Sequence, residues 1–137
     1  MIERLCATKE TETLLEDLMP IHGPVLFHQS GGCCDGSAPM CFPRKEFKVG
    51  SRDIFLGTIC NQPFFIASDQ FAYWEHTQLI IDVVPGRGGM FSIEGPTGKR
   101  FLTRSRVFSE DELVELKKHP PKSAAEVTQF EGLKTTS

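Results

Sequence analysis

The sequence predicts an α+β fold, mostly β, in a single compact domain with a helix near each end. A chain of 137 residues is long enough for one domain with its own core. Its middle consists of short apolar runs rich in Val, Ile, Phe and Thr, and Gly, Pro or Asn separates most of them. We therefore expect a helical segment at 1–19, a β-rich core at 20–118 and a flexible tail at 119–137.

The two helices have distinct sequence signals. Near the start, three leucines at helical spacing form one apolar face, and Pro20 is expected to end that helix. Near the end, "SEDELVELKK" places Ser109 as an N-cap and Glu112 three residues later, which is a capping box. The polar segment "KSAAEVTQFEGLKTTS" that follows has few large apolar side chains, so we expect it to be flexible.

The apolar runs in the middle of the chain are the expected strands. They are "GPVLFHQ", "EFKVG", "DIFLGTIC", "QPFFIAS", "QLIIDVV", "MFSIEGP" and "RFLTRSRVF". Within the fifth run, Asp82 needs a partner for its carboxylate, and the nearby arginines at 87, 104 and 106 are the candidates. We expect a structural ion pair there rather than a catalytic group.

Composition excludes several classes of function. The net charge is −3, so we expect neither a nucleic acid nor an anionic membrane as a partner. No apolar stretch approaches the roughly 20 residues of a membrane helix, and the start lacks a signal-peptide pattern. The expected location is the cytoplasm, where clustered thiols stay reduced and act as ligands or nucleophiles.

The stretch "HQSGGCCDGSAPMC" gathers three of the five cysteines beside a histidine. Gly31 and Gly32 permit a tight turn whose backbone N–H groups favour anions such as thiolates. Gln29 and Asp35 are expected to orient this loop. Thiolate and imidazole suit zinc, iron or copper, or an iron–sulfur cluster. The predicted ligands are Cys33, Cys34, Cys41 and His28.

Two other interpretations of the loop stay open. Cys33 or Cys34 is a candidate nucleophile that acts on aldehydes or redox equivalents, with His28 as its base. Alternatively, the cysteines are small buried residues of a metal-free interaction module. The strand-like position of Cys60 favours a core thiol.

Three segments resemble the family of unknown function numbered seven hundred seventy-nine (DUF779). They are "HGPVLFHQSGGCCDGSAPMCFP", "WEHTQLIIDVVPGRGGMFSIE" and "RFLTRSRVF", and the resemblance covers roughly residues 20 to 110. Genes of that family often neighbour aldehyde dehydrogenase genes. The resemblance therefore implies an accessory role in aldehyde or alcohol metabolism, with an aldehyde dehydrogenase as partner. A chain without GxGxxG does not hold the dehydrogenase's own cofactor domain.

A weaker resemblance concerns the A-type iron–sulfur carriers. Where those carriers place a cysteine in a Ser-Gly-Cys-Ser-Gly turn, this chain has "SGGCCDGS". The resemblance implies the carrier fold, with Cys33 or Cys34 as the first cluster ligand. The carriers' C-terminal Cys-Gly-Cys is replaced here by "FLTRSRVF". A homodimer is a further candidate arrangement, because strand-rich proteins with apolar edges often dimerise.

Overall fold

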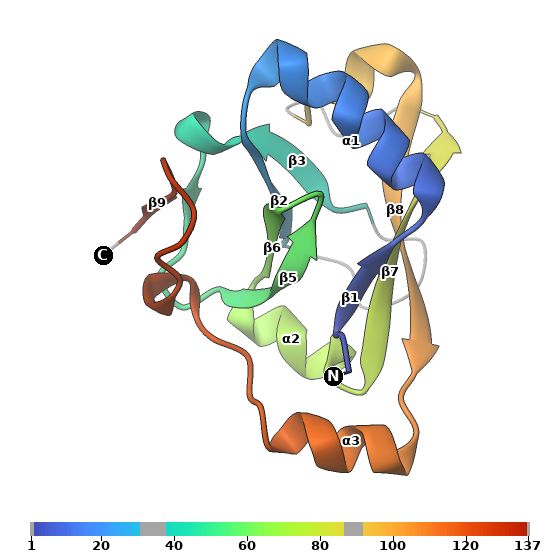
Figure 1. The fold of residues 1–137 in the computed structure, drawn as a ribbon, viewed down its shortest axis with the longest axis vertical. Helices are drawn as coiled ribbons and strands as arrows, with labels where there is room; N and C mark the ends of the chain where they lie inside the picture. The colour runs from blue at the N-terminus through green and yellow to red at the C-terminus, as the bar shows by residue number, and fades with distance from the viewer. Residues whose placement is uncertain (1, 31–37, 87–91, 137) are drawn as a thin grey trace.

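A computed structural model describes residues 2–30, 38–86 and 92–136 (Figure 1). It confirms the α+β, mostly β prediction: the strands form mixed sheets, with helices packed around them. The strands are β1 (Leu5–Ala7), β2 (Val25–Gln29), β3 (Met40–Pro43), β4 (Lys48–Val49), β5 (Ile54–Ile59), β6 (Gln62–Ile66), β7 (Thr77–Pro85), β8 (Lys99–Val107) and β9 (Lys134–Thr135). The helices are α1 (Lys9–His22), α2 (Ser68–Trp74) and α3 (Glu110–Lys117), with short 3-10 turns η1 (Arg44–Glu46), η2 (Gly95–Thr97) and η3 (Ala124–Glu126).

The first sheet has the order β1-β7-β8. Strand β1 runs parallel to β7, and β7 pairs antiparallel with β8 along the full length of both strands. Alternate residues point to opposite faces of a strand. Leu79 and Ile81 of β7 are accordingly buried, whereas Asp82 is half-buried and reaches the outer-face guanidinium of Arg104 on β8.

The second sheet has the order β3-β2-β6-β5. Strand β2 pairs antiparallel with β3 and parallel with β6. Both central strands are buried at every residue, as continuous apolar runs predict for strands covered on both faces. Strands β5 and β6 form a hairpin whose turn residues, Cys60 and Asn61, have φ of 49° and 65°. Asparagine tolerates this left-handed conformation, which suits a tight hairpin.

The main core lies between the two sheets and beneath α1. Its centre is a phenylalanine cluster: the Phe27 ring stacks on Phe64 at 5.8 Å and meets Phe101 edge-on at 5.2 Å. Burying one such side chain contributes about 1.5–3 kcal/mol. The predicted apolar face of α1 packs onto this cluster, because Leu15 and its neighbouring leucines are buried.

Two helix boundaries test the sequence prediction. Helix α3 begins at the predicted capping box, with Ser109 and Glu112 bonded reciprocally. Helix α1 does not stop at Pro20, so that prediction was wrong; it continues to His22 and ends at Gly23, whose φ is 77°. Proline removes a single N–H donor, and the Gly23 amide still donates to Met19 at 2.7 Å. The last turn of the helix therefore survives.

The described part of one expected strand is a turn. In "MFSIEGP", the described residues from Ser92 onward lead into η2 and form no strand. The Ile93 amide donates instead to the Cys41 carbonyl at 3.0 Å, on the edge of β3 that does not pair with β2. This tertiary contact replaces the local β propensity of the run. None of the described helices has the length and apolar character needed to span a bilayer.

The segment expected to be a flexible tail has defined contacts. Ala124 and Val127 are buried, and β9 pairs parallel with β4. The buried Arg44 holds the segment from within, because its Nη1 donates to the Glu131 carbonyl at 3.0 Å and its guanidinium lies over the Phe130 ring. Backbone pairing and one aromatic side chain therefore hold a segment whose composition is polar. The boundaries 1–19, 20–118 and 119–137 stay a prediction.

Candidate functional site at the edge of the second sheet

The predicted cysteine loop joins β2 to β3 at one edge of the second sheet. The structure describes the residues on either side of the loop, which are His28 and Gln29 at the end of β2 and Cys41 in β3. The remaining predicted site residues lie outside the described residues. They are Gly31, Gly32, Cys33, Cys34 and Asp35. The structure therefore describes the residues of β2 and β3 from which the loop extends.

His28 is held by a carboxylate. It is 9% exposed, and its Nε2 lies 2.7 Å from Oδ2 of Asp53, the residue just before β5. The same oxygen accepts the Gly50 amide at 3.0 Å, and the imidazole packs on the Phe47 ring. A carboxylate only accepts hydrogen bonds, so Nε2 carries the proton in the neutral ring. In that tautomer Nδ1 carries the lone pair, so Nδ1 is the ring atom that can bind a metal ion.

Gln29 links the two sheets. Its side chain is fully enclosed, and Oε1 accepts the Thr103 hydroxyl of β8 at 2.9 Å. Its backbone carbonyl accepts the Ala67 amide, which precedes α2. The last residue of β2 is thus fixed at both its side chain and its backbone, so the loop begins from a rigid position.

Cys41 and His28 lie on opposite faces of the sheet. Cys41 is directly opposite Phe27, and His28 is opposite Met40. Since side chains alternate along a strand, Cys41 points with Phe27 into the main core and His28 points the other way. The structure therefore does not bring these two predicted ligands together.

The Cys41 thiol is in an environment that disfavours the thiolate. Its side chain is fully buried, and burial raises the pKa of the thiol well above its usual value, with a further contribution from the nearby Glu94 carboxylate. The Cys41 amide donates to the Ser92 hydroxyl at 2.8 Å. This residue packs as a small apolar side chain in the core.

Glu94 is a buried acid that the sequence prediction missed. It is 1% exposed, accepts the Ser92 hydroxyl through Oε1, and its Oε2 lies 3.4 Å from the Phe101 amide. Burial raises the pKa of the Glu94 carboxyl, and the hydrogen bond from Ser92 partly opposes the rise. The sequence signal that could have pointed to the burial of Glu94 is its position inside the apolar run "MFSIEGP". Asp53, equally missed, had no such local signal.

The other described thiols have raised pKa values as well. Cys60 lies in the β5–β6 turn, and burial followed by the nearby acids of α1 raises the pKa of its thiol. Burial likewise raises the pKa of Cys6 on β1. Within the described residues, no three His, Cys, Asp or Glu side chains gather as metal ligands. A metal site therefore needs donors from residues 31–37.

The Asp82 ion pair is confirmed. Arg104 Nε donates to Asp82 Oδ2 at 2.8 Å, and the Thr8 hydroxyl donates to Oδ1 at 3.0 Å. The hydrogen bond from Arg104, more than any other contact, lowers the pKa of Asp82. This carboxylate joins α1 to the first sheet and lies outside the candidate site.

Comparison with known families identifies the chain. A family described as a domain of unknown function (DUF779) matches residues 14–107. The chain belongs to this family. The DUF779 match runs from α1 to the end of β8 and includes every described residue of the candidate site. No curated protein and no solved structure matches the chain. The association with aldehyde dehydrogenase and the likeness to A-type carriers stay predictions.

Proposed function

We propose that this DUF779 chain is a small accessory protein whose loop at residues 30–39 binds a metal ion or cluster. Cys33 and Cys34 supply thiolates and His28 supplies an imidazole, a donor set that suits zinc, iron or copper. The observation that carries the proposal is the 2.7 Å contact between His28 and Asp53 at the base of the loop.

A carboxylate behind an imidazole is the usual support of a histidine ligand. Histidines that bind metals commonly donate their other ring N–H to a carboxylate, which fixes the tautomer and raises the basicity of the bound nitrogen. His28 has this partner, and its burial shields the pair from water.

The ligand set that we propose is smaller than the one predicted from sequence. Cys41 is left out, because its thiol is buried on the opposite face of the sheet from His28. Gly31 and Gly32 would let the loop turn, and Asp35 with Gln29 would orient it. Three protein ligands leave a position for solvent or substrate, as at catalytic zinc sites. A bound ion would supply Lewis acidity or electron transfer there.

The proposal includes the partner that the family resemblance implies. An aldehyde dehydrogenase in the cytoplasm would receive the metal or electrons from this chain, or would be regulated by it. A homodimer is part of the same proposal.

The test is to measure metal and acid-labile sulfide per chain, on untagged protein purified without oxygen. We expect near-stoichiometric metal in wild type and in C60S, a control thiol away from the loop. The double variant C33S/C34S should lose it, and D53N should weaken affinity by about 10- to 100-fold. Metal that is unchanged in C33S/C34S would contradict the proposal.

The same His28–Asp53 pair favours one second candidate, a thiol-dependent enzyme. A base oriented by a carboxylate is the arrangement that activates nucleophiles. Here His28 would take the thiol proton, the sulfur of Cys33 or Cys34 would add to an aldehyde carbonyl, and the proton would pass to the resulting alkoxide. Rapid alkylation of a single loop cysteine in metal-free protein, slowed by D53N, would favour this candidate over the metal site.

A further inference from the structure

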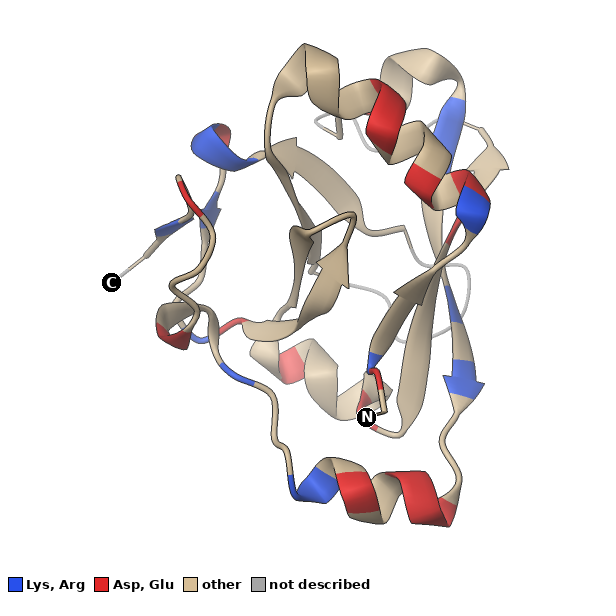
Figure 2. Cartoon of the chain, in the orientation of Figure 1, with Lys and Arg blue, Asp and Glu red and all other residues tan. Residues whose placement is uncertain are grey.

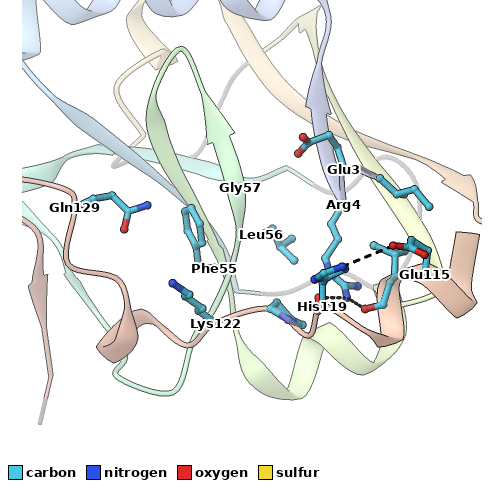
Figure 3. Close-up of a pocket in the computed structure, with 12 residues that line it drawn as sticks. Glu3, Arg4, Phe55, Leu56, Gly57, Glu115, His119, Lys122 and Gln129 are labelled. Atoms are coloured by element: carbon cyan, nitrogen blue, oxygen red, sulfur yellow. Dashed lines mark hydrogen bonds and ion pairs between the residues drawn. The ribbon is translucent and has the colours of Figure 1, made fainter.

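The residues that follow α3 pack against the loop that supports the candidate site. We call residues 122–136 the C-terminal strap, and residues 49–53 the support loop, which ends at Asp53. Figure 3 shows Lys122 of the strap beside Phe55 of β5, and the Phe55 amide donates to the Lys122 carbonyl at 2.8 Å. The strap therefore begins beside the strand that follows the support loop.

Backbone hydrogen bonds join the strap to the support loop along the length of the loop. Three carbonyl groups of the loop each accept a backbone amide of the strap. The pairs are Thr136 to Val49 at 2.9 Å, Ala125 to Ser51 at 3.2 Å and Ala124 to Asp53 at 2.7 Å. These distances are those of ordinary N–H···O hydrogen bonds. Since alternate residues of the loop are bonded in this way, the strap fixes the path of the loop backbone.

The strand that leads into the support loop also depends on the strap. β4 belongs to a sheet of two strands, and its partner is β9 of the strap. On the other side of the loop, β5 pairs with β6 along its length. A pair of strands is marginally stable by itself. Release of the strap therefore frees the β4 side of the loop, while β6 continues to hold the β5 side.

Gly50, on the β4 side of the loop, positions the carboxylate that holds His28. The Gly50 amide donates to Asp53 Oδ2 at 3.0 Å, and the same oxygen lies 2.7 Å from His28 Nε2. A Cβ atom at residue 50 would lie 3.1 Å from Asp53 Oδ1, which is closer than most side chains pack. The carboxylate is thus seated directly on the Gly50 backbone, so a movement of β4 would shift it relative to the imidazole.

The strap is attached to the domain without being part of its main core. In chain order, that core extends from Leu5 to Phe101. The packed side chains of the strap include the buried Ala124 and Phe130, whose ring lies 5.6 Å from that of Phe55. Segments with few buried apolar contacts open locally at a lower free energy than the core. The strap is therefore able to leave the support loop while the two large sheets stay folded.

From these contacts we infer that docking of the C-terminal strap regulates the candidate site. With the strap docked, Gly50 and Asp53 hold His28 in the tautomer whose Nδ1 binds a metal ion. With the strap released, the Asp53 carboxylate loses its fixed place and the Nδ1–H tautomer of His28 appears. The step from the tautomer to metal affinity rests on the proposed function, whereas the step from the strap to the tautomer needs no metal.

The first test measures the tautomer of His28 in the metal-free full chain, by the ¹⁵N shifts of the neutral imidazole. Ala124→Gln places a long polar side chain at a buried position and should release the strap, whereas Ala125→Gln makes the same change at the exposed residue beside it. Release is detected as amide exchange at Phe55 and Thr136 that is about tenfold faster or more.

We expect the Nδ1–H tautomer of His28 in Ala124→Gln, and the Nε2–H tautomer alone in wild type and Ala125→Gln. A strap that is released while His28 keeps the Nε2–H tautomer would overturn the inference. Gly50→Ala crowds Asp53 with the strap in place, so it should change the tautomer without faster exchange at Thr136.

Two checks separate release of the strap from loss of the fold. The amide shifts of Phe27 and Phe101, which lie in the main core, should match those of wild type in each variant. Phe130→Ser is a second release variant, because it removes the ring that contacts Phe55 and Arg44. It should change the tautomer of His28 as Ala124→Gln does. A change in only one of the two released proteins would trace to the substitution itself and would count against regulation by the strap.

Binding of Zn²⁺ gives the reciprocal test. Because coupling between two sites is reciprocal, Zn²⁺ should slow amide exchange at Ala124 and Thr136 in wild type. Its affinity should fall by about fivefold or more in Ala124→Gln and stay unchanged in Ala125→Gln. Equal Zn²⁺ affinity in wild type and both variants would overturn the inference. Failure of Zn²⁺ to bind wild type would instead contradict the proposed function, and the tautomer in metal-free protein would still decide whether the strap acts on His28.

Discussion

Ionisable side chains have opposite kinds of partner in two regions of the molecule. The first region is the outer face of the first sheet. The second is the inner edge of the second sheet, where Cys41 of β3 meets Ser92 and Glu94. On the outer face, opposite charges meet: Asp82 accepts from Arg104, and Glu112 takes two hydrogen bonds from Arg106 at 2.9 and 3.0 Å. Figure 2 shows this pattern as cationic residues on β8 beside the acidic start of α3. At the inner edge, the buried Glu94 meets the Ser92 hydroxyl and the Phe101 backbone amide.

The two regions differ in their exposure to solvent, and this exposure sets the strength of their polar contacts. Exposed ion pairs are screened by water and typically contribute 0 to about 1 kcal/mol. A buried polar group that loses its partner costs about 1–3 kcal/mol, because no water replaces the bond. Substitutions at the inner edge should therefore have large effects and those on the outer face small ones.

The sharpest contrast should appear in thiol reactivity. At neutral pH we expect Cys41 to react with iodoacetamide at least about a thousandfold more slowly than Cys6 or Cys60, since it reacts only when the core opens. Its burial and raised pKa both act in this direction. Mass spectrometry of labelled peptides over time gives the rates. Labelling of Cys41 as fast as Cys60 would contradict its place in the core.

Removal of the buried acid should have the next largest effect. We expect Glu94→Ala to lower the free energy of unfolding by about 2–4 kcal/mol, because it leaves a void and removes the carboxylate that accepts the Ser92 hydroxyl. Glu94→Gln is the matched control, since it keeps the shape and the hydrogen-bond acceptor. Urea unfolding measures both variants. An Ala variant as stable as the Gln variant would contradict this account.

Wild type and Glu94→Gln together give a pH test with a defined sign. Burial raises the folded-state pKa of Glu94 above its unfolded value. The stability linked to its proton is therefore present below the unfolded pKa and is lost as pH rises through the folded pKa. Wild type should lose stability relative to Glu94→Gln over that interval. A parallel pH dependence of the two proteins would contradict the prediction.

Asp53 and Asp82 compare a carboxylate that pairs with a buried imidazole with one that pairs with an arginine on the outer face. We expect Asp53→Asn to cost about 1–2 kcal/mol and to mix the tautomers of His28, because an amide can donate as well as accept. Asp82→Asn should cost under about 1 kcal/mol, since its partner Arg104 is half exposed. Unfolding curves and ¹⁵N shifts of the imidazole measure the two effects. A fixed Nε2–H tautomer in Asp53→Asn would show that another group orients the ring.

The smallest effect should come from the exposed pair between Arg106 of β8 and Glu112 of α3. The hydrogen bonds from Arg106 lower the pKa of Glu112 to about 2, against 4.5 for an unperturbed glutamate. Arg106→Gln should move this pKa up toward 4.5 without a measurable change in unfolding at neutral pH. The contribution of Glu112 is present above 4.5 and disappears as pH falls through about 2. Carboxyl ¹³C shifts follow the titration, with Arg104→Gln as the control.

The sequence predicted those helices and strands that depend on residues close together in the chain. The capping box at Ser109 and the leucine face of α1 are of this kind, as are most of the apolar strands. Predictions failed where a distant contact outweighed local preference. The described part of the run "MFSIEGP", from Ser92 onward, becomes a turn because the Ile93 amide donates to the Cys41 carbonyl.

The candidate site shows the same division. The sequence by itself determined that an imidazole precedes a pair of adjacent thiols on a glycine-rich loop, and that Asp82 needs a cation. Only the tertiary structure decided that Asp53 holds His28, that Glu94 is buried, and that Cys41 faces away from His28. The physical reason is strand register: pairing between distant segments fixes the face on which each side chain lies, and a shift of one residue would reverse every face.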